Sequence, residues 1–318
     1  MENHNCILIV NIEPNAYNSQ CRIATKGNNK VIGMKLLYSA IVGAGVIGFG
    51  SSAAFAADLK CAPEALATKY PSLVGKTIKV GQDGESPPYS FRDPKDFNNL
   101  VGVDADLAKA TFKCLGVPIE YSVGAWSGLL PAVIAGQIDV MWDTLLYTPT
   151  RAKQVDFVAE MSSATGVLVA AGNPKNVKSL DDICGLTATA GLGTTEEAEL
   201  HETSAKCEKN GKAAVTIVPT SDIPAGSRLI QNGRADLLLD DLALIGSMAG
   251  DNPKLFQVGF SIRSDKIKAV GLTKGNNDLA KAIFDALSIL EADGTAKAIF
   301  DKYNVDYSVV LPPKILTE

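Results

Sequence analysis

The stretch that decides the fold runs from Ala125 to Phe157 and reads AWSGLLPAVIAGQIDVMWDTLLYTPTRAKQVDF. Its apolar spacing predicts an amphipathic helix, Ser127–Ala135, which leads into a short apolar strand, Ile138–Trp142. A loop rich in hydroxyl side chains follows, and Arg151 closes it. Open α/β sheets bind ligands beyond the carboxyl ends of their strands, and a guanidinium can hold a carboxylate through two parallel hydrogen bonds. This stretch therefore predicts half of a binding cleft for a small anionic or zwitterionic solute.

Upstream of this region, the sequence has the order of a secretory signal. Met34 and Lys35 open an uncharged apolar run, and Ala54-Phe55-Ala56 supplies small residues at positions −3 and −1. We expect a signal peptide over residues 34–56, cleaved after Ala56, and a mature protein in the periplasm. An uncleaved membrane anchor is the alternative, but the run is shorter than the roughly 20 residues of a bilayer span. Residues 1–33 are expected to be a disordered leader or a mis-assigned start.

The charge of the remaining chain excludes several classes of protein. Residues 1–56 hold four of the 30 basic and two of the 35 acidic residues, so residues 57–318 carry 26 basic and 33 acidic groups, a net charge of −7. This acidic balance without a basic stripe predicts no nucleic-acid binding and fits a diffusing monomer. Gly43–Gly48 matches a dinucleotide-binding fingerprint, but it lies inside the predicted signal, so we expect no cofactor.

Four cysteines remain after the predicted signal: Cys61, Cys114, Cys184 and Cys207. An exported protein meets an oxidising compartment, so an even number of cysteines indicates disulfides. Three pairings are possible, and proximity along the chain favours Cys61–Cys114 and Cys184–Cys207. No C-x-x-C spacing is present, and His201 is the one histidine nearby, so we expect no metal site.

Strand and helix patterns alternate from Thr77 to Lys302, which is typical of α/β architecture. Two parts of the chain share one arrangement, in which a helix ends at glycine and a strand follows after one or two residues. Gly136 ends the first such helix and Gly233 ends the second. Ser308–Glu318 is expected to be a tail. The shared arrangement favours two similar lobes.

The chain resembles the amino-acid-type periplasmic solute-binding proteins of ABC importers, bacterial extracellular solute-binding protein family 3. Each matching motif is weak alone, but their order and spacing over about 230 residues make the resemblance specific. The motifs are Gly81-Gln82-Asp83 with Pro88-Tyr89-Ser90-Phe91, Gly102–Ala108, Trp126, Gln137-Ile138-Asp139, Thr148–Arg151, Val155-Asp156-Phe157, Gly193-Thr194-Thr195, Gly233–Asp236 and Ala292–Thr295.

This resemblance implies a type II periplasmic binding protein fold with two α/β lobes joined by two crossing strands. We expect lobe 1 over residues 57–165 and 274–318, and lobe 2 over 172–265. The crossing segments are expected at 166–171 and 267–273. A solute would lie between the lobes, and an inner-membrane permease would receive it.

The resemblance also implies the ligand-binding residues. Arg151 would hold the solute carboxylate, and Asp241 would hold its ammonium, with Asp240 as a rival because the strand end can shift by one residue. Thr194 and Thr195 begin a predicted helix and would form an anion site with its N-terminus. Thr144 would donate to the carboxylate through its hydroxyl or amide. The remaining expected cleft residues are Trp126 and Tyr89 as apolar walls, with Trp142 in the core, and Asp83, Glu85, Ser86 and Asp143.

The sequence departs from familiar amino-acid binders at three positions in this region. Asp143 and Leu146 replace small or hydroxyl residues, and Ser86 replaces a frequent aromatic, so the solute's side chain stays open. The alternative function is a cyclohexadienyl-dehydratase-like enzyme on the same fold. It would need a positioned general acid, for which Glu85, Asp143 and Asp241 are the candidates. We expect binding without catalysis.

Overall fold

The computed structural model describes residues 6–13, 16–23 and 61–317. The chain forms two units, Met1–Ala53 and Ala54–Glu318. In the first unit, β1 (Cys6–Glu13) pairs antiparallel with β2 (Ala16–Ile23), whereas the sequence analysis expects no regular structure there. The Ile7–Val10 run is apolar and rich in β-branched residues, which favour strands. The predicted signal peptide and its cleavage site lie outside the described residues.

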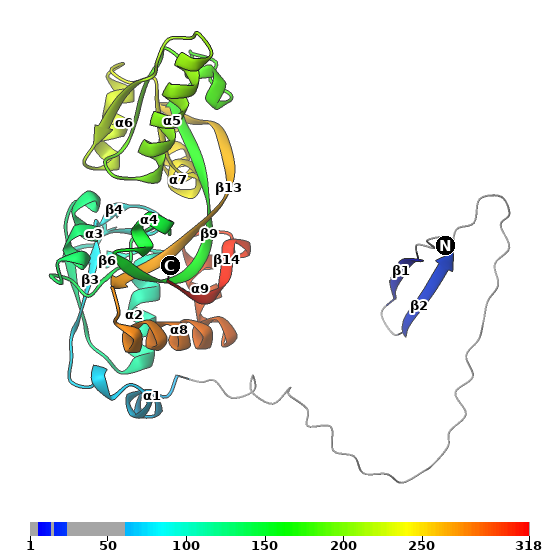
Figure 1. The fold of residues 1–318 in the computed structure, drawn as a ribbon, viewed down its shortest axis with the longest axis vertical. Helices are drawn as coiled ribbons and strands as arrows, with labels where there is room; N and C mark the ends of the chain where they lie inside the picture. The colour runs from blue at the N-terminus through cyan, green and yellow to red at the C-terminus, as the bar shows by residue number, and fades with distance from the viewer. Residues whose placement is uncertain (1–5, 14–15, 24–60, 318) are drawn as a thin grey trace. The chain divides into compact units, whose positions relative to one another are not determined.

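The second unit contains two lobes that share one nine-stranded sheet, in the order β11-β10-β12-β9-β13-β8-β3-β7, with β14 beside β9. We call lobe 1 the part that contains β3, β7 and β8, and lobe 2 the part that contains β10, β11 and β12. Two long antiparallel strands, β9 (Val155–Ala170) and β13 (Phe256–Thr273), run from one lobe into the other (Figure 1).

Lobe 1 alternates strands and helices, with parallel pairing of β3 to β7 and of β3 to β8. Its elements before β9 are α1 (Pro63–Lys69), β3 (Ile78–Gln82), α2 (Val103–Leu115), β7 (Ile119–Val123), α3 (Trp126–Ile134), β8 (Val140–Met141) and α4 (Pro149–Ala152), with a separate small sheet of β4 (Glu85–Ser86), β5 (Ser90–Asp93) and β6 (Asp96–Val101). After β13 the chain returns to lobe 1 as α8 (Asn277–Ala292), α9 (Thr295–Lys302) and β14 (Val310–Leu316). The expected tail is therefore partly a strand of the sheet.

Lobe 2 repeats the alternation with β10 (Thr187–Gly191), α5 (Thr195–Lys209), β11 (Thr216–Thr220), α6 (Ile223–Gln231), β12 (Leu237–Asp241) and α7 (Leu242–Asp251). Its strands β10, β11 and β12 are parallel, and β12 pairs antiparallel with β9. The parallel strands bring their carboxyl ends to one edge of the sheet, as ligand-binding α/β lobes require.

The passage between the lobes differs from the predicted one. On β9, Phe157–Met161 pairs with β14 of lobe 1, and Thr165–Val169 pairs with β12 of lobe 2. On β13, the register shifts between Arg263 and Ile267. The segments expected to cross, 166–171 and 267–273, are instead sheet-paired parts of lobe 2 and lobe 1. Both strands are longer than predicted, and each one passes from one lobe to the other just before the range expected for the crossing.

Helices cover both faces of the sheet in each lobe, so each lobe has a core on either side. In lobe 1, Phe112 and Ile283 pack from α2 and α8 around the buried Trp142, which confirms Trp142 as a core residue, and Val133 of α3 packs on the opposite face. In lobe 2, α5 covers one face, and α6 and α7 cover the other. Among the described residues, no helix is both long and apolar enough for a membrane span.

Both expected disulfides are present, one in each lobe. Cys61–Cys114 ties the start of the described second unit to α2, and Cys184–Cys207 ties the segment before β10 to the last turn of α5. The proximity argument therefore selected the correct pairing from the three possibilities. The second disulfide ties down α5, whose first residues Thr195 and Glu196 line the cavity described next, and the first ties down α2, whose Asp104 accepts the N–H of the cavity residue Thr144.

Candidate functional site

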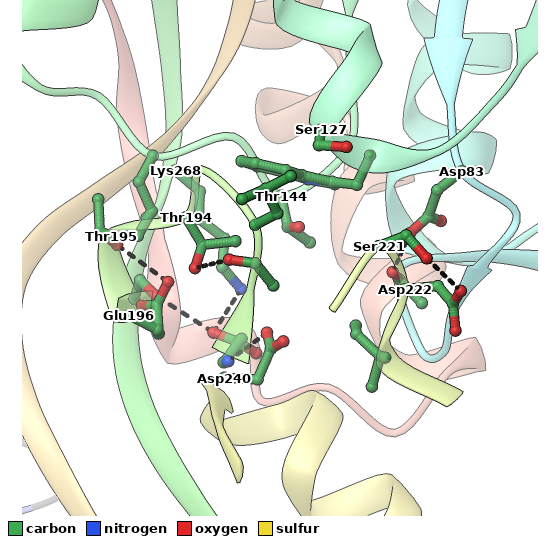
Figure 2. Close-up of a pocket in the computed structure, with 18 of the residues that line it drawn as sticks. Asp83, Ser127, Thr144, Thr194, Thr195, Glu196, Ser221, Asp222, Asp240 and Lys268 are labelled. Carbon is green, nitrogen blue, oxygen red and sulfur yellow. Dashed lines mark hydrogen bonds and ion pairs between the residues drawn. The ribbon is translucent and has the colours of Figure 1, made fainter. Parts of the chain in front are cut away.

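A cavity of about 620 Å³, including space open to solvent, lies between the two lobes. Figure 2 shows its labelled polar residues converging from opposite sides. Lobe 1 and the adjoining parts of β9 and β13 contribute Asp83, Ser86, Trp126, Ser127, Thr144, Leu146, Arg151, Ser163 and Lys268. Lobe 2 contributes Gly191, Leu192, Thr194, Thr195, Glu196, Ser221, Asp222, Ile223, Asp240 and Asp241.

Arg151 reaches the cavity from the short helix α4, which Thr148 caps by accepting a hydrogen bond from the Arg151 backbone N–H. Its Nη1 donates to the Leu146 carbonyl at 2.7 Å, and its Nη2 donates to the Gly193 carbonyl of lobe 2 at 2.9 Å. The guanidinium therefore makes a hydrogen bond from lobe 1 to lobe 2. A guanidinium has five N–H donors, so three remain for a solute. Burial lowers the pKa of Arg151, although Glu196 opposes the shift.

The wall beside Arg151 is Trp126, whose ring centroid lies 5.6 Å from the guanidinium carbon. The Trp126 Nε1–H donates to the Asp143 carbonyl at 2.9 Å, which fixes the orientation of the ring. Asp143, predicted as a cleft residue, does not line the cavity. Its carboxylate is buried behind the wall, where Oδ2 accepts the Asp83 backbone N–H at 2.8 Å. The Asp143 side chain therefore faces the protein interior.

Thr144 lines the cavity in a strained backbone conformation, with φ of 50°, which β-branched residues rarely adopt. Its N–H donates to Oδ2 of the buried Asp104 at 2.7 Å. The amide that the sequence analysis offered to a solute is therefore already occupied, and the hydroxyl is the group that remains. Strain of this kind is concentrated at functional sites, where the surroundings hold it in place.

The start of α5 forms much of the lobe 2 wall, and its polar groups are mainly bonded to each other. The Thr194 hydroxyl caps the helix by accepting the Glu197 N–H at 3.1 Å, and it donates to the Gly191 carbonyl at 2.8 Å. Thr195 Oγ1 donates to Glu196 Oε2 at 3.0 Å, and Glu197 accepts the Gly193 N–H at 2.6 Å. The helix supplies two acids of its own to its first turn, which weakens the expected anion site there.

Asp241 ends β12 and caps α7, and it forms a buried ion pair with Lys268 of β13, with Nζ to Oδ2 at 2.8 Å. The Lys268 ammonium also lies 3.7 Å from the ring centroid of Tyr89. Tyr89, predicted as an apolar wall, is only 2% exposed and does not line the cavity. The Tyr89 ring lies against the Lys268 ammonium, and Lys268 lines the cavity instead of Tyr89.

The loop after β3 brings Asp83 and Ser86 to the cavity, while Glu85 is exposed and does not line it. Asp83 accepts hydrogen bonds from the Glu85 N–H at 2.9 Å and from the Ser86 hydroxyl. Glu85 pairs with Phe91 in a short antiparallel sheet, in which adjacent side chains point to opposite faces. Since Ser86 points inward, Glu85 points outward, and the structure does not bring Glu85 to the cavity.

The sequence predicts eight residues that line this one cavity: Asp83, Ser86, Trp126, Thr144, Arg151, Thr194, Thr195 and Asp241. It missed Lys268, Glu196, Ser221 and Asp222, among others. Asp222 follows the strand that precedes α6 and caps that helix, a position that parallels Thr194 before α5. That parallel was available in the sequence, whereas a buried lysine in a long strand has no comparable signal.

A layer of buried carboxyl groups supports the lobe 1 wall. Burial raises the pKa of Asp83 and of Asp104 to about 6 each, although hydrogen bonds and the nearby Lys268 oppose the shift in Asp104. Burial also raises the pKa of Asp143 and of Glu160 well above the usual range. Lys268 is the one basic residue among the buried side chains that the structure describes.

The described residues contain no group of three or more histidine, cysteine, aspartate or glutamate side chains arranged to hold a metal ion. The cavity instead offers one guanidinium, hydroxyl groups and several carboxylates from two lobes. Such a set suits a small molecule with both a negative and a positive group, because buried charges require partners of opposite sign.

Residues 78–306 match the family described as bacterial extracellular solute-binding proteins, family 3. The chain is 31% identical over 229 residues to the L-cystine-binding protein TcyJ of Escherichia coli (strain K12), covering 71% of this chain and 82% of TcyJ. It is 27% identical to the putative ABC transporter arginine-binding protein 2 of the same strain, covering 73% of this chain and 92% of that protein.

Among solved structures, the chain is similar to an ancestral arginine-binding protein bound to arginine. The TM-score is 0.66 at 30% identity, and the match covers 71% of this chain and 97% of the ancestral protein. The chain therefore belongs to family 3 of the bacterial extracellular solute-binding proteins, and its two-lobed α/β fold is the fold of that family.

Proposed function

We propose that this member of solute-binding protein family 3 binds a zwitterionic solute, an amino acid or an amino-acid derivative, and delivers it to an ABC importer. The observation that carries the proposal is the position of Arg151, whose guanidinium faces the cavity between the lobes. Its three remaining donors suit a carboxylate, and its bond to Gly193 links solute capture to closure of the lobes.

The family and the two disulfides support export, so we place the mature protein in the periplasm, with cleavage after Ala56. There it would act as a monomer that passes its solute to an inner-membrane permease. The names of the two relatives report binding of L-cystine and of arginine, so these compounds are the first solutes to test.

The candidate acids do not support the dehydratase alternative. Glu85 and Asp143 lie outside the cavity, and Asp241 is held in an ion pair with Lys268. A general acid must carry a proton within hydrogen-bond reach of the leaving group. None of the three acids meets this requirement as placed, so we propose binding without catalysis.

The test is a thermal-shift screen of the solute-stripped protein against the twenty proteinogenic L-amino acids and L-cystine, followed by calorimetric titration. We expect at least one compound to bind, and Arg151→Met to weaken that binding by about 100-fold or more, since truncating one partner of a buried charge pair costs 2–5 kcal/mol. Arg234→Met changes an exposed arginine of lobe 2 outside the cavity and serves as the control. Unaltered affinity in Arg151→Met would refute the assignment.

A further inference from the structure

The ion pair between Lys268 and Asp241 occupies the place where a solute ammonium would be expected. The Lys268 side chain is 2% exposed and the Asp241 side chain 10% exposed, so both charges are largely removed from water. The lysine also rests on the Tyr89 ring, an additional favourable contact for a cation. Separating a buried ion pair is strongly destabilising, so an incoming ammonium would not readily displace Lys268.

All acceptor positions of the Asp241 carboxylate are already used by the protein. Oδ1 accepts the N–H groups of Ala243 and Leu244 at 3.0 and 3.4 Å, as the cap of α7. Oδ2 accepts the Lys268 ammonium at 2.8 Å and the Ser163 hydroxyl at 3.1 Å. A carboxylate has about four acceptor sites, so none remains for a solute.

The neighbouring residue, Asp240, has the opposite character. Its Oδ1 accepts the Asp241 N–H at 2.7 Å, and its Oδ2 makes no hydrogen bond or ion pair with any residue that the structure describes. Burial raises the pKa of Asp240 well above the usual range, and the acidic neighbours Glu196, Asp241 and Asp83 add to this shift, although the hydrogen bond from the Asp241 N–H opposes it. Figure 2 shows Asp240 at the cavity on the same side as Glu196. A cation at Asp240 would neutralise this excess of negative charge.

The other acids of lobe 2 at the cavity have cationic partners. Glu196 lies 3.5 Å from the Lys266 ammonium, and Asp222 lies 3.7 Å from the Arg228 guanidinium. Among the lobe 2 acids at the cavity, Asp240 is therefore the one whose carboxylate has no cationic partner in the part of the chain that the structure describes.

We propose that Asp240, and not Asp241, receives the solute ammonium, and that Lys268 is a built-in counter-ion that holds Asp241 as a positioning residue. The inference rests on the proposed function and deepens it, because it makes a solute α-ammonium a requirement for tight binding. The carboxylate of the solute would meet Arg151 of lobe 1 and its ammonium Asp240 of lobe 2, so one molecule would bridge both lobes.

The test compares two isosteric variants of the full chain, Asp240→Asn and Asp241→Asn, with Asp251→Asn on the exposed end of α7 as control. The first measurement is the melting temperature of the solute-stripped proteins. Asp241→Asn breaks the buried ion pair and is expected to melt at least about 5 °C lower, whereas Asp240→Asn removes an uncompensated charge and melts no lower than the wild type. An unchanged melting temperature in Asp241→Asn would overturn the inference.

The second measurement is calorimetric titration with L-arginine and L-cystine, and with their analogues that lack the α-ammonium. Asp240→Asn is expected to weaken binding of the amino acid by about 100-fold and of the analogue by less than about threefold, and Asp240→Glu to restore part of the loss. Equal affinity of Asp240→Asn and wild type for the amino acid would overturn the inference. If no compound of the wider screen binds the wild type, the proposed function fails, while the melting temperatures still decide the roles of the two acids.

Discussion

The two walls of the cavity differ in how much of their polar chemistry is still available to a solute. On the lobe 1 wall, Arg151 uses two of its five donors and Thr144 keeps its hydroxyl. On the lobe 2 wall, the side chains of Thr194 and Asp241 cap helices and make hydrogen bonds within the protein, so they are not available to a solute. Matching a residue to a cavity therefore does not establish that its side chain can bind a ligand.

This difference follows from where each wall lies in the fold. The lobe 2 wall consists of helix starts, where several N–H groups need acceptors, so capping side chains are consumed there. The lobe 1 wall also includes the starts of α3 and α4, but no side chain caps α3, and Thr148, which caps α4, does not line the cavity. In the loop after β8, the buried Asp104 accepts the Thr144 N–H and leaves the Thr144 hydroxyl available. Asp240 is the exception in lobe 2, because it precedes the cap instead of forming it.

Removing the disulfide of each lobe should produce the largest change in the free energy of unfolding. In the chain-entropy account, stabilisation grows with the closed loop, so Cys61→Ser with Cys114→Ser should cost about 4 kcal/mol and Cys184→Ser with Cys207→Ser about 3 kcal/mol. The sequence separations are 53 and 23 residues. Denaturant unfolding of the two double variants would measure the costs. A larger cost for the lobe 2 disulfide would show that native-state contacts at α5 outweigh loop entropy.

Acidification should stabilise the empty protein, because its buried carboxyl groups bind protons that the unfolded chain does not. Asp83 and Asp104 have pKa values of about 6 in the fold, against 3.8 as the ordinary value. Between pH 7.5 and 5.5 the folded state takes up protons, so the free energy of unfolding should rise by about 1–2 kcal/mol as the pH falls.

The control for this pH dependence is Asp104→Asn, which removes one of the two titrating groups of the lobe 1 wall and should flatten the dependence. Denaturant unfolding at several pH values checks both expectations. A free energy of unfolding that falls as the pH is lowered from 7.5 to 5.5 would contradict the claim that burial raises the pKa of these carboxyl groups.

Removing the Thr194 hydroxyl should produce a smaller change, and mainly in stability. Thr194→Ala deletes the cap of α5 and should cost about 1 kcal/mol, and Thr194→Ser should recover most of it. Chemical denaturation and calorimetric titration distinguish the two roles of the hydroxyl. Unchanged stability with a large loss of affinity would mean that Thr194 binds the solute directly, as the sequence analysis expected.

The sequence predicted much of the fold because long segments have clear periodicity and recognisable ends. Helix α3 (Trp126–Ile134) begins and ends one residue before the predicted helix Ser127–Ala135, and β8 (Val140–Met141) lies within the predicted strand Ile138–Trp142. Residues 155–165 of β9 and 256–266 of β13 lie outside the predicted crossing segments. A strand that passes from one lobe to the other changes its surroundings along its length, so it has no uniform apolar alternation that would reveal it.

The same limitation explains the missed site residues. Lys268 lies within the predicted crossing segment 267–273, but its burial depends on Asp241, which lies 27 positions earlier in the sequence and in the other lobe. The position of Asp143 after a strand was correctly noted, but the direction of its side chain depends on the Asp83 N–H, 60 residues away. Motif spacing gives the order of residues along the chain, and tertiary contacts determine which groups remain available.

A crystal structure of the protein with an amino acid bound would test the central claim most directly. The account predicts the solute carboxylate within hydrogen-bond distance of the Arg151 guanidinium and the ammonium at Asp240, with Lys268 still paired to Asp241. A solute bound away from Arg151, or an ammonium at Asp241 with Lys268 displaced, would contradict it.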